Sequence, residues 1–97
     1  MRPRITINRK DGELQIWLNP TGRDLLVREL QRLSEQHDHF HFMPEDMEGE
    51  VPVRDRAYQD GAEVIEWGKV FFRPDEWDLQ CFPHVVDSAD PSGSSET

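Results

Sequence analysis

The pair Asp11-Gly12 separates two short segments, residues 5–7 and 14–18, in which apolar and polar residues alternate. Alternation with a period of two is typical of a strand, and Asp-Gly between two such segments is a strong signal for a tight β-hairpin turn. We therefore expect a hairpin near the N-terminus. One face carries the residues that we expect to be buried, which are Ile5, Ile7, Leu14, Ile16 and Leu18, and the other carries Thr6, Gln15 and Trp17.

A helix is predicted to follow the hairpin. Either Asn19 caps it with Pro20 at the first helical position, or Thr21 caps it with Asp24 three residues later. The apolar residues that follow recur at helical spacing and form one stripe: Leu26, Val27, Leu30 and Leu33. This stripe is expected to pack on the sheet.

Alternation returns at residues 38–43, which predicts another strand. Phe40 and Phe42 have the same phase and are expected to pack under the helix. His39 and His41 then lie on the opposite face of the sheet, because successive side chains of a strand point to opposite sides.

A long loop is predicted next. Residues 44–60 contain two prolines and an acidic cluster, with a short strand placed at residues 51–53. The last core strand is expected at residues 63–72, where Gly68 indicates a bulge or a close approach of backbone. The apolar residues between positions 77 and 82 are expected to fold back as a short closing strand.

This order of elements, β-β-α-β-(loop)-β, predicts an α+β fold. We expect a small, mostly antiparallel sheet of about four to five strands, with one amphipathic helix packed on one face and the other face uncovered. Residues 1–85 are expected to form a single domain. Residues 86–97 are acidic and rich in serine, and we expect them to be a disordered tail.

Cysteine content indicates a reducing compartment. Cys81 is the only cysteine of the 97 residues, so no internal disulfide can form, whereas secreted domains of this size usually carry several. Its apolar neighbours favour an inert, buried thiol. No apolar run approaches the roughly 20 residues of a membrane span. We therefore expect a cytoplasmic protein with no membrane partner.

The charge is strongly and unevenly acidic. The net charge is −9; residues 1–36 carry seven Lys and Arg against five Asp and Glu, while residues 37–97 carry four against fifteen. Such a field repels phosphate backbones and anionic lipid and accelerates encounter with basic partners. Nucleic acid is therefore not expected as a partner, although acidity also serves solubility alone.

Few residues of the sequence indicate a catalytic or metal-binding site. His39 and His41 share a face and could jointly hold a metal ion with a third ligand such as Glu45, Glu48, Glu66 or His84, but no cysteine pair or second motif with ligand spacing supports such a site. We find no phosphate-binding loop or nucleophile elbow. The prediction is a protein that is not an enzyme and needs no cofactor.

Aromatic residues point instead to a binding surface. Trp17 and Phe71 alternate away from the predicted core and are expected beside His39 and His41 on the uncovered sheet face. Exposed apolar patches mark interaction sites and Trp is enriched in them, so Trp17, Trp67, His39 and His41 are expected to form the centre of an interface. The alternative is that the C-terminal segment covers this face. Carboxylates would surround the patch, so the full set of predicted partner-binding residues is Trp17, His39, His41, Glu45, Asp46, Glu48, Glu50, Glu63, Glu66 and Trp67.

Over roughly residues 4–73, the chain resembles the bacterial immunity proteins of polymorphic toxin systems, in particular immunity protein family thirty-two. The resemblance rests on Asn19-Pro20-x-Gly22 before the helix, on the aspartate and alternating histidines of residues 38–43, and on residues 63–72, where Lys69 precedes an aromatic segment. The chain departs from the family pattern at Met47-Glu48-Gly49, where the family has a Trp-Gly-Gly-like turn.

The resemblance implies an immunity protein that binds and neutralises a cognate secreted toxin, with no catalytic residues of its own. Its acidic residues would meet a basic active-site cleft of the toxin. Two alternatives remain open: a small adaptor or homodimer whose open sheet face is the interface, and a sensor that binds a metal through His39 and His41.

Overall fold

The computed structural model describes residues 1–86 and contains the predicted hairpin. Strand β1 (Ile5–Lys10) pairs antiparallel with β2 (Glu13–Leu18). Asp11 and Gly12 have φ angles of 54° and 79°, and two positive values at the central positions are what a type I′ turn requires. The predicted tail lies outside the described residues apart from Val86.

Helix α1 (Pro20–Arg32) begins at the first of the two predicted caps. The Asn19 side-chain oxygen accepts a hydrogen bond from the Gly22 amide at 2.7 Å and another from the Arg4 amide at 2.9 Å. A Cβ atom at Gly22 would lie 2.7 Å from the Arg4 carbonyl oxygen and 2.9 Å from the Ile5 side chain. The first turn of α1 is therefore fixed directly against β1.

Within residues 1–86, the predicted single sheet is in fact two sheets of three strands each. One has the order β2-β1-β5, with β5 at Glu63–Val64; the other has the order β4-β3-β6, from β3 (His39–Pro44), β4 (Val51–Val53) and β6 (Gly68–Phe71). Among the strand pairs formed by residues 1–86, only β3 and β4 run parallel. The α+β class and the mostly antiparallel pairing are confirmed, whereas the strand expected at residues 63–72 divides between the sheets.

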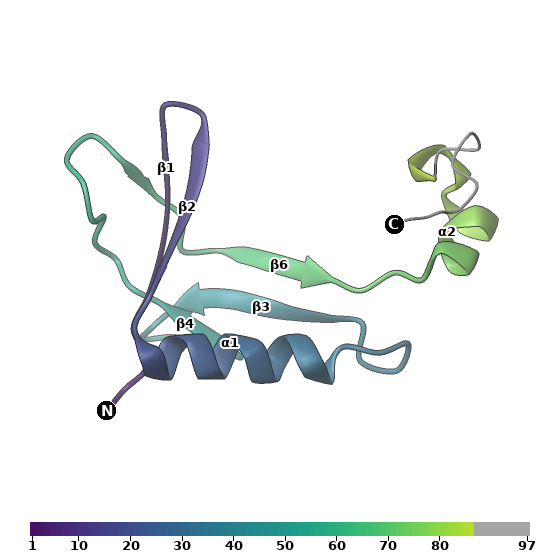
Figure 1. The fold of residues 1–97 in the computed structure, drawn as a ribbon, viewed down its shortest axis with the longest axis horizontal. Coiled ribbons are helices and arrows are strands. Elements are labelled where there is room, and N and C mark those ends of the chain that lie inside the picture. Colours follow the sequence, from purple (N-terminus) through teal and green to yellow (C-terminus); the bar gives the residue numbers. More distant parts are fainter. Residues whose placement is uncertain (87–97) are drawn as a thin grey trace.

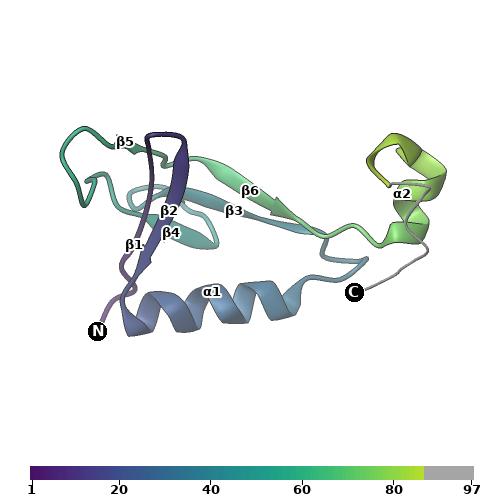
Figure 2. The ribbon, with the colours of Figure 1, turned by 45° about the horizontal axis from the view of Figure 1, so that its top comes forward.

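A backbone hydrogen bond joins the two sheets at β1: the Arg54 amide, directly after β4, donates to the Ile5 carbonyl at 2.8 Å. The Ile65 amide, directly after β5, donates to the Ile7 carbonyl at 2.8 Å and extends the β1–β5 pairing. The core lies between α1 and the strands (Figure 2) and consists of Ile5, Ile7, Phe40, Val51 and Val53, with Leu25, Leu26, Leu33, Phe42, Ile65 and Val70 packed around them.

The expected buried face of the hairpin is correct for β1 and wrong for β2. Leu14, Ile16 and Leu18 are 61%, 45% and 39% exposed, although they share a face with Ile5 and Ile7. Helix α1 starts at the base of the hairpin and runs away from it beneath β3 and β6 (Figures 1 and 2), so it covers β1 only near its first turn.

The predicted apolar stripe of α1 is only partly buried. Leu26 and Leu33 pack on the core, but Val27 and Leu30 are exposed. The buried position between them belongs to Glu29, whose carboxylate receives the Arg32 guanidinium at 3.1 Å. A buried carboxylate requires such a partner.

The opposite face of the hairpin is covered, contrary to expectation. Thr6 and Asn8 are buried there, and the Trp17 ring stacks on Tyr58 with centroids 4.4 Å apart and planes 7° from parallel. Tyr58 belongs to the connection 54–62 between β4 and β5. This connection therefore forms a cover that the residue pattern of the hairpin does not reveal.

The C-terminal part of the described chain is helical. Helix α2 (Asp75–Cys81) and a 3₁₀ turn (Pro83–Val85) replace the expected closing strand, and they project beyond the end of β6, away from the hairpin (Figure 1). Acidic residues at Asp75, Glu76 and Asp78 favour a helix start, because they interact with the positive end of the helix dipole. Cys81 is exposed, not buried.

Candidate protein-binding surface

The β3–β6 pair places imidazole and aromatic side chains on the sheet face that points away from α1. His39 lies opposite Phe71 and His41 lies opposite Lys69 in the antiparallel register, while Phe40 and its partner Val70 take the core side. The His39 and Phe71 rings are 5.8 Å apart, and Phe71 is 55% exposed. We call His39, His41, Lys69 and Phe71 the β3–β6 face.

An ion-pair network supports one end of this face. Asp38 lies 2.8 Å from the His39 Nδ1 atom and 3.2 Å from the Arg73 guanidinium. The hydrogen bond with His39, and then the charge of Arg73, hold the pKa of Asp38 below its ordinary value. The Arg73 guanidinium also lies over the Phe71 ring, 5.2 Å from its centroid, in a cation–π contact.

The other end is supported by Glu50. Its carboxylate accepts a hydrogen bond from the His41 amide at 2.9 Å and lies 3.2 Å from the His41 Nδ1 atom. The amide hydrogen bond is the main cause that lowers the pKa of Glu50. Glu50 therefore fixes the position of His41 as much as it contributes charge.

The acidic segment 45–50 adjoins this end of the face. Glu45 pairs with Arg54 at 3.2 Å, which ties the start of the segment to the end of β4. Asp46 and Glu48 are exposed, and no ion pair engages them within residues 1–86. Within segment 45–50, these two carboxylates are the ones available to a partner.

The remaining predicted site residues are dispersed. Glu63 lies on β5 and pairs with Arg9 at 2.6 Å, in the other sheet. Glu66 and Trp67 lie in the connection between β5 and β6, where Trp67 is largely exposed. Trp17 is stacked on Tyr58, so the expectation that it lies on an uncovered face is wrong.

Sequence reasoning missed Lys69 as a member of the β3–β6 face, and Asp38 and Arg73 as the residues that support one end of it. Lys69 and Arg73 place two cations around Phe71, so this part of the face is not purely acidic. Their signal was the register between β3 and β6, and a register between strands far apart in the chain is not visible in either strand alone.

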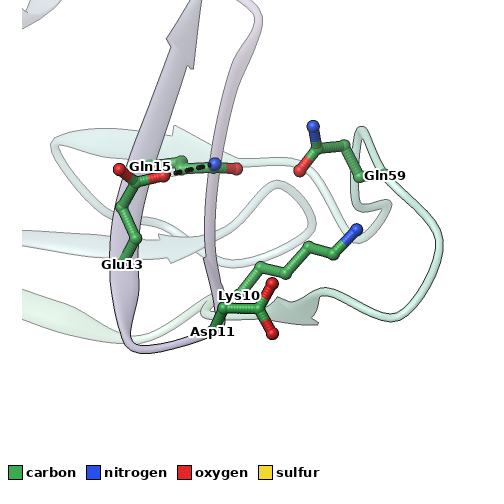
Figure 3. Close-up of a pocket in the computed structure, with 5 residues that line it drawn as sticks. All are labelled: Lys10, Asp11, Glu13, Gln15 and Gln59. Carbon is green, nitrogen blue, oxygen red and sulfur yellow. Dashed lines mark hydrogen bonds between the residues drawn. The ribbon is translucent and has the colours of Figure 1, made fainter.

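Two other features, the His39–His41 pair as a metal site and a depression at the hairpin tip, give weaker support for a functional role. The His39 and His41 rings meet edge to face with centroids 5.0 Å apart, and no group of three His, Cys, Asp or Glu residues within residues 1–86 is arranged as a metal-ligand set. An open depression of about 370 Å³ at the hairpin tip is lined by polar residues (Figure 3): Lys10, Asp11, Glu13, Gln15 and Gln59. Gln15 donates to Glu13 there at 2.8 Å, and we assign the depression no role.

The chain matches no protein-family profile, no curated protein and no solved structure. Of the helices formed by residues 1–86, none has the length and apolar character that crossing a bilayer requires.

Proposed function

We propose that this chain is an immunity protein that binds a cognate secreted bacterial toxin and neutralises it by occluding the toxin's active site. The observation that carries the proposal is the exposed β3–β6 face beside the acidic segment 45–50. The aspartate and alternating histidines on which the resemblance to immunity proteins rests are the residues at and beside this face. A sheet face with an exposed aromatic ring and adjacent carboxylates suits a partner that is basic around an apolar centre.

The proposed mechanism is steric and electrostatic. Asp46 and Glu48 attract a basic cleft and accelerate association, while His39 and Phe71 lose water at the centre of the interface and slow dissociation. Lys69 adds specificity, because no ion pair engages it within residues 1–86 and a partner must present an acceptor or carboxylate opposite it.

The first experiment concerns the toxin. The polypeptide encoded beside this chain is expressed with and without it, and growth and complex formation are measured. We expect this chain to restore growth and to co-purify with the C-terminal domain of a secreted neighbour. Growth that is equally poor with and without the chain contradicts the proposal.

The second experiment locates the interface with two variants of equal charge change. Asp46→Lys/Glu48→Lys reverses the segment beside the β3–β6 face, and Asp75→Lys/Glu76→Lys reverses two exposed residues of α2. We expect the first pair to slow association by about 10-fold or more and the second to slow it far less. Equal slowing means that only the total charge matters and removes the acidic segment from the interface.

A third comparison tests the aromatic centre. Phe71→Ala is expected to raise the dissociation rate by about 10-fold or more, because it removes the most exposed ring of the face. Phe82→Ala removes a similarly exposed ring beyond α2 and serves as the control. If both variants dissociate like the parent protein, the partner binds elsewhere.

A further inference from the structure

The outer edge of β2 lacks a partner strand within residues 1–86. In the order β2-β1-β5, strand β2 is outermost, and it stands clear at one side of the hairpin (Figure 1). The free edge runs from Glu13 to Leu18. An unpaired edge of this length is a template for pairing with another strand.

The hydrogen bonds of β1 show which backbone groups point toward this free edge. The carbonyl groups of Ile5 and Ile7 accept hydrogen bonds from Arg54 and Ile65, on the side away from β2. Ile5 and Ile7 therefore form non-hydrogen-bonded pairs with Leu18 and Ile16, since the two kinds of pair alternate along an antiparallel ladder. By the same alternation, the backbone N–H and C=O groups of Leu14, Ile16 and Leu18 point away from β1, toward the free edge.

The same three residues expose their side chains. They lie on the core face of the hairpin but beyond the reach of α1, and each is more than one-third exposed. One strand edge thus combines outward backbone donors and acceptors with an exposed apolar row.

The other edge strands carry features that discourage pairing. Strand β5 has two residues, β4 has three with Pro52 at its centre, and β6 contains Gly68 and Lys69. Short length, proline and lysine are the usual devices that protect sheet edges. Strand β2 has six residues, no proline and no lysine, and Glu13 is its single charge.

We propose that two copies of this chain associate through β2, antiparallel about a twofold axis, with Ile16 opposite Ile16 of the second copy. In this register Leu14 lies opposite the second copy's Leu18, so the exposed row of each copy is completed by that of the other. The β2-β1-β5 sheets of the two copies then form one continuous sheet. The inference is independent of the proposed toxin binding, because the β3–β6 face lies on the other sheet.

The charges fit a second copy in this register. Residues 1–36 are slightly basic, whereas the carboxylates that repel like molecules belong to residues 37–97. Glu13 would face the second copy's Asn19 and not its own counterpart. Asp11 at the hairpin tip would approach the start of the second copy's α1, which has no acidic residue in its first turn and where the exposed Arg23 lies beside its own partner Asp24.

Sedimentation velocity of the full chain between about 1 and about 200 µM tests the proposal, since an interface made of one six-residue strand from each copy is small and is expected to dissociate in the micromolar range. Ile16→Lys places a charge in the apolar row and is expected to weaken dimerisation by about 10-fold or more. Val27→Lys is the matched control, because Val27 is 44% exposed and Ile16 is 45% exposed, but Val27 lies on α1. A monomer at all concentrations, or a dimer that Ile16→Lys leaves intact, overturns the proposal.

Cysteine cross-linking tests the register without relying on the stability of the lysine variant. In a Cys81→Ser background, Ile16→Cys is expected to form a disulfide-linked dimer with oxidised glutathione, because Cα atoms of facing hydrogen-bonded residues lie about 5.5 Å apart. Leu14→Cys is expected to cross-link to Leu18→Cys in a mixture and poorly to itself. Self-linking of Leu14→Cys that is faster than that of Ile16→Cys contradicts the register.

Discussion

The carboxylate of Glu50 receives the His41 amide at 2.9 Å, one position before the parallel ladder of β3 and β4 begins at Phe42 and Val51. The Glu50 side-chain oxygen therefore extends the β3–β4 pairing by one residue, and backbone hydrogen bonds continue it from Phe42 onward. Parallel strands are normally joined by a crossover of a dozen or more residues, whereas residues 45–50 alone return the chain here. Glu50 helps to hold this short return in place.

Glu50→Gln should destabilise the protein by about 1 kcal/mol at neutral pH, because the amide keeps an acceptor for the His41 N–H but loses the charge that strengthens the hydrogen bond in a partly exposed site. Since the pKa of Glu50 is lowered on folding, its contribution is present above its ordinary pKa of 4.5 and is lost as pH falls through the lower folded value. Urea unfolding from about pH 7 to about pH 3 measures this.

The free energies of the parent protein and of Glu50→Gln should converge at acid pH. Glu48→Gln, in the same segment, is the control and should leave the unfolding free energy unchanged at pH 7. A difference between the parent and Glu50→Gln that persists undiminished at low pH shows that the effect is steric.

Gly22→Ala should lower the unfolding free energy by about 2 kcal/mol, although alanine is the better helix former by about 1 kcal/mol. The reason is the contact of the new Cβ atom with the Arg4 carbonyl oxygen, which is backbone and cannot rotate away. Gln31→Ala, at an exposed position of α1, is the control and should be neutral or slightly stabilising. A stabilised Gly22→Ala variant means that α1 can move away from β1 at little cost.

Asn19→Ala should cost about 2 kcal/mol, because the side chain caps α1 and also joins the N-terminal segment through Arg2 and Arg4. Asn19→Asp keeps the oxygen that accepts from Gly22 and Arg4 but loses the donor to the Arg2 carbonyl, so its loss should be smaller. Thermal unfolding of both variants measures the difference. Equal losses would assign the effect to the donor alone.

Tyr58→Ala should expose Trp17, since the stacked ring covers one side of the indole. Acrylamide quenching in a Trp67→Phe/Trp77→Phe background follows Trp17 alone, and the quenching constant should rise by about half or more, with a loss of about 1 kcal/mol in stability. Gln59→Ala, the next residue of the same connection, should change neither quantity. Unchanged quenching in Tyr58→Ala indicates that the connection does not hold Trp17.

Local signals in the chain predicted local structure well. Asp11-Gly12 and Asn19-Pro20 act within one turn, and both the hairpin and the helix start are where they were predicted. The α+β class followed from the order of elements. Segment 77–82 was assigned wrongly because its apolar residues also fit a short helix, and Pro74 with the acids that follow it starts one.

Burial was harder to predict because it depends on which element covers which face. The pattern of β2 is that of a half-buried strand, but α1 runs away from it and leaves Ile16 exposed. Trp17 is covered by Tyr58 from a connection whose path is not encoded in the hairpin. For the β3–β6 face, the positions of His39, His41 and Phe71 were predicted, and Lys69 was missed because the long-range register that places it opposite His41 was not visible.

The short return at residues 45–50 also bears on how Asp46 and Glu48 meet a partner. The Glu45–Arg54 ion pair holds one end of the segment, and the hydrogen bond from the His41 amide to Glu50 holds the other. Between them, the Met47 amide donates to the Pro44 carbonyl at 2.9 Å and closes a turn. The segment thus has few conformations left to lose, so little conformational entropy opposes association. Carboxylates on a long free loop would have to be ordered at each encounter, whereas these are ordered once, when the chain folds.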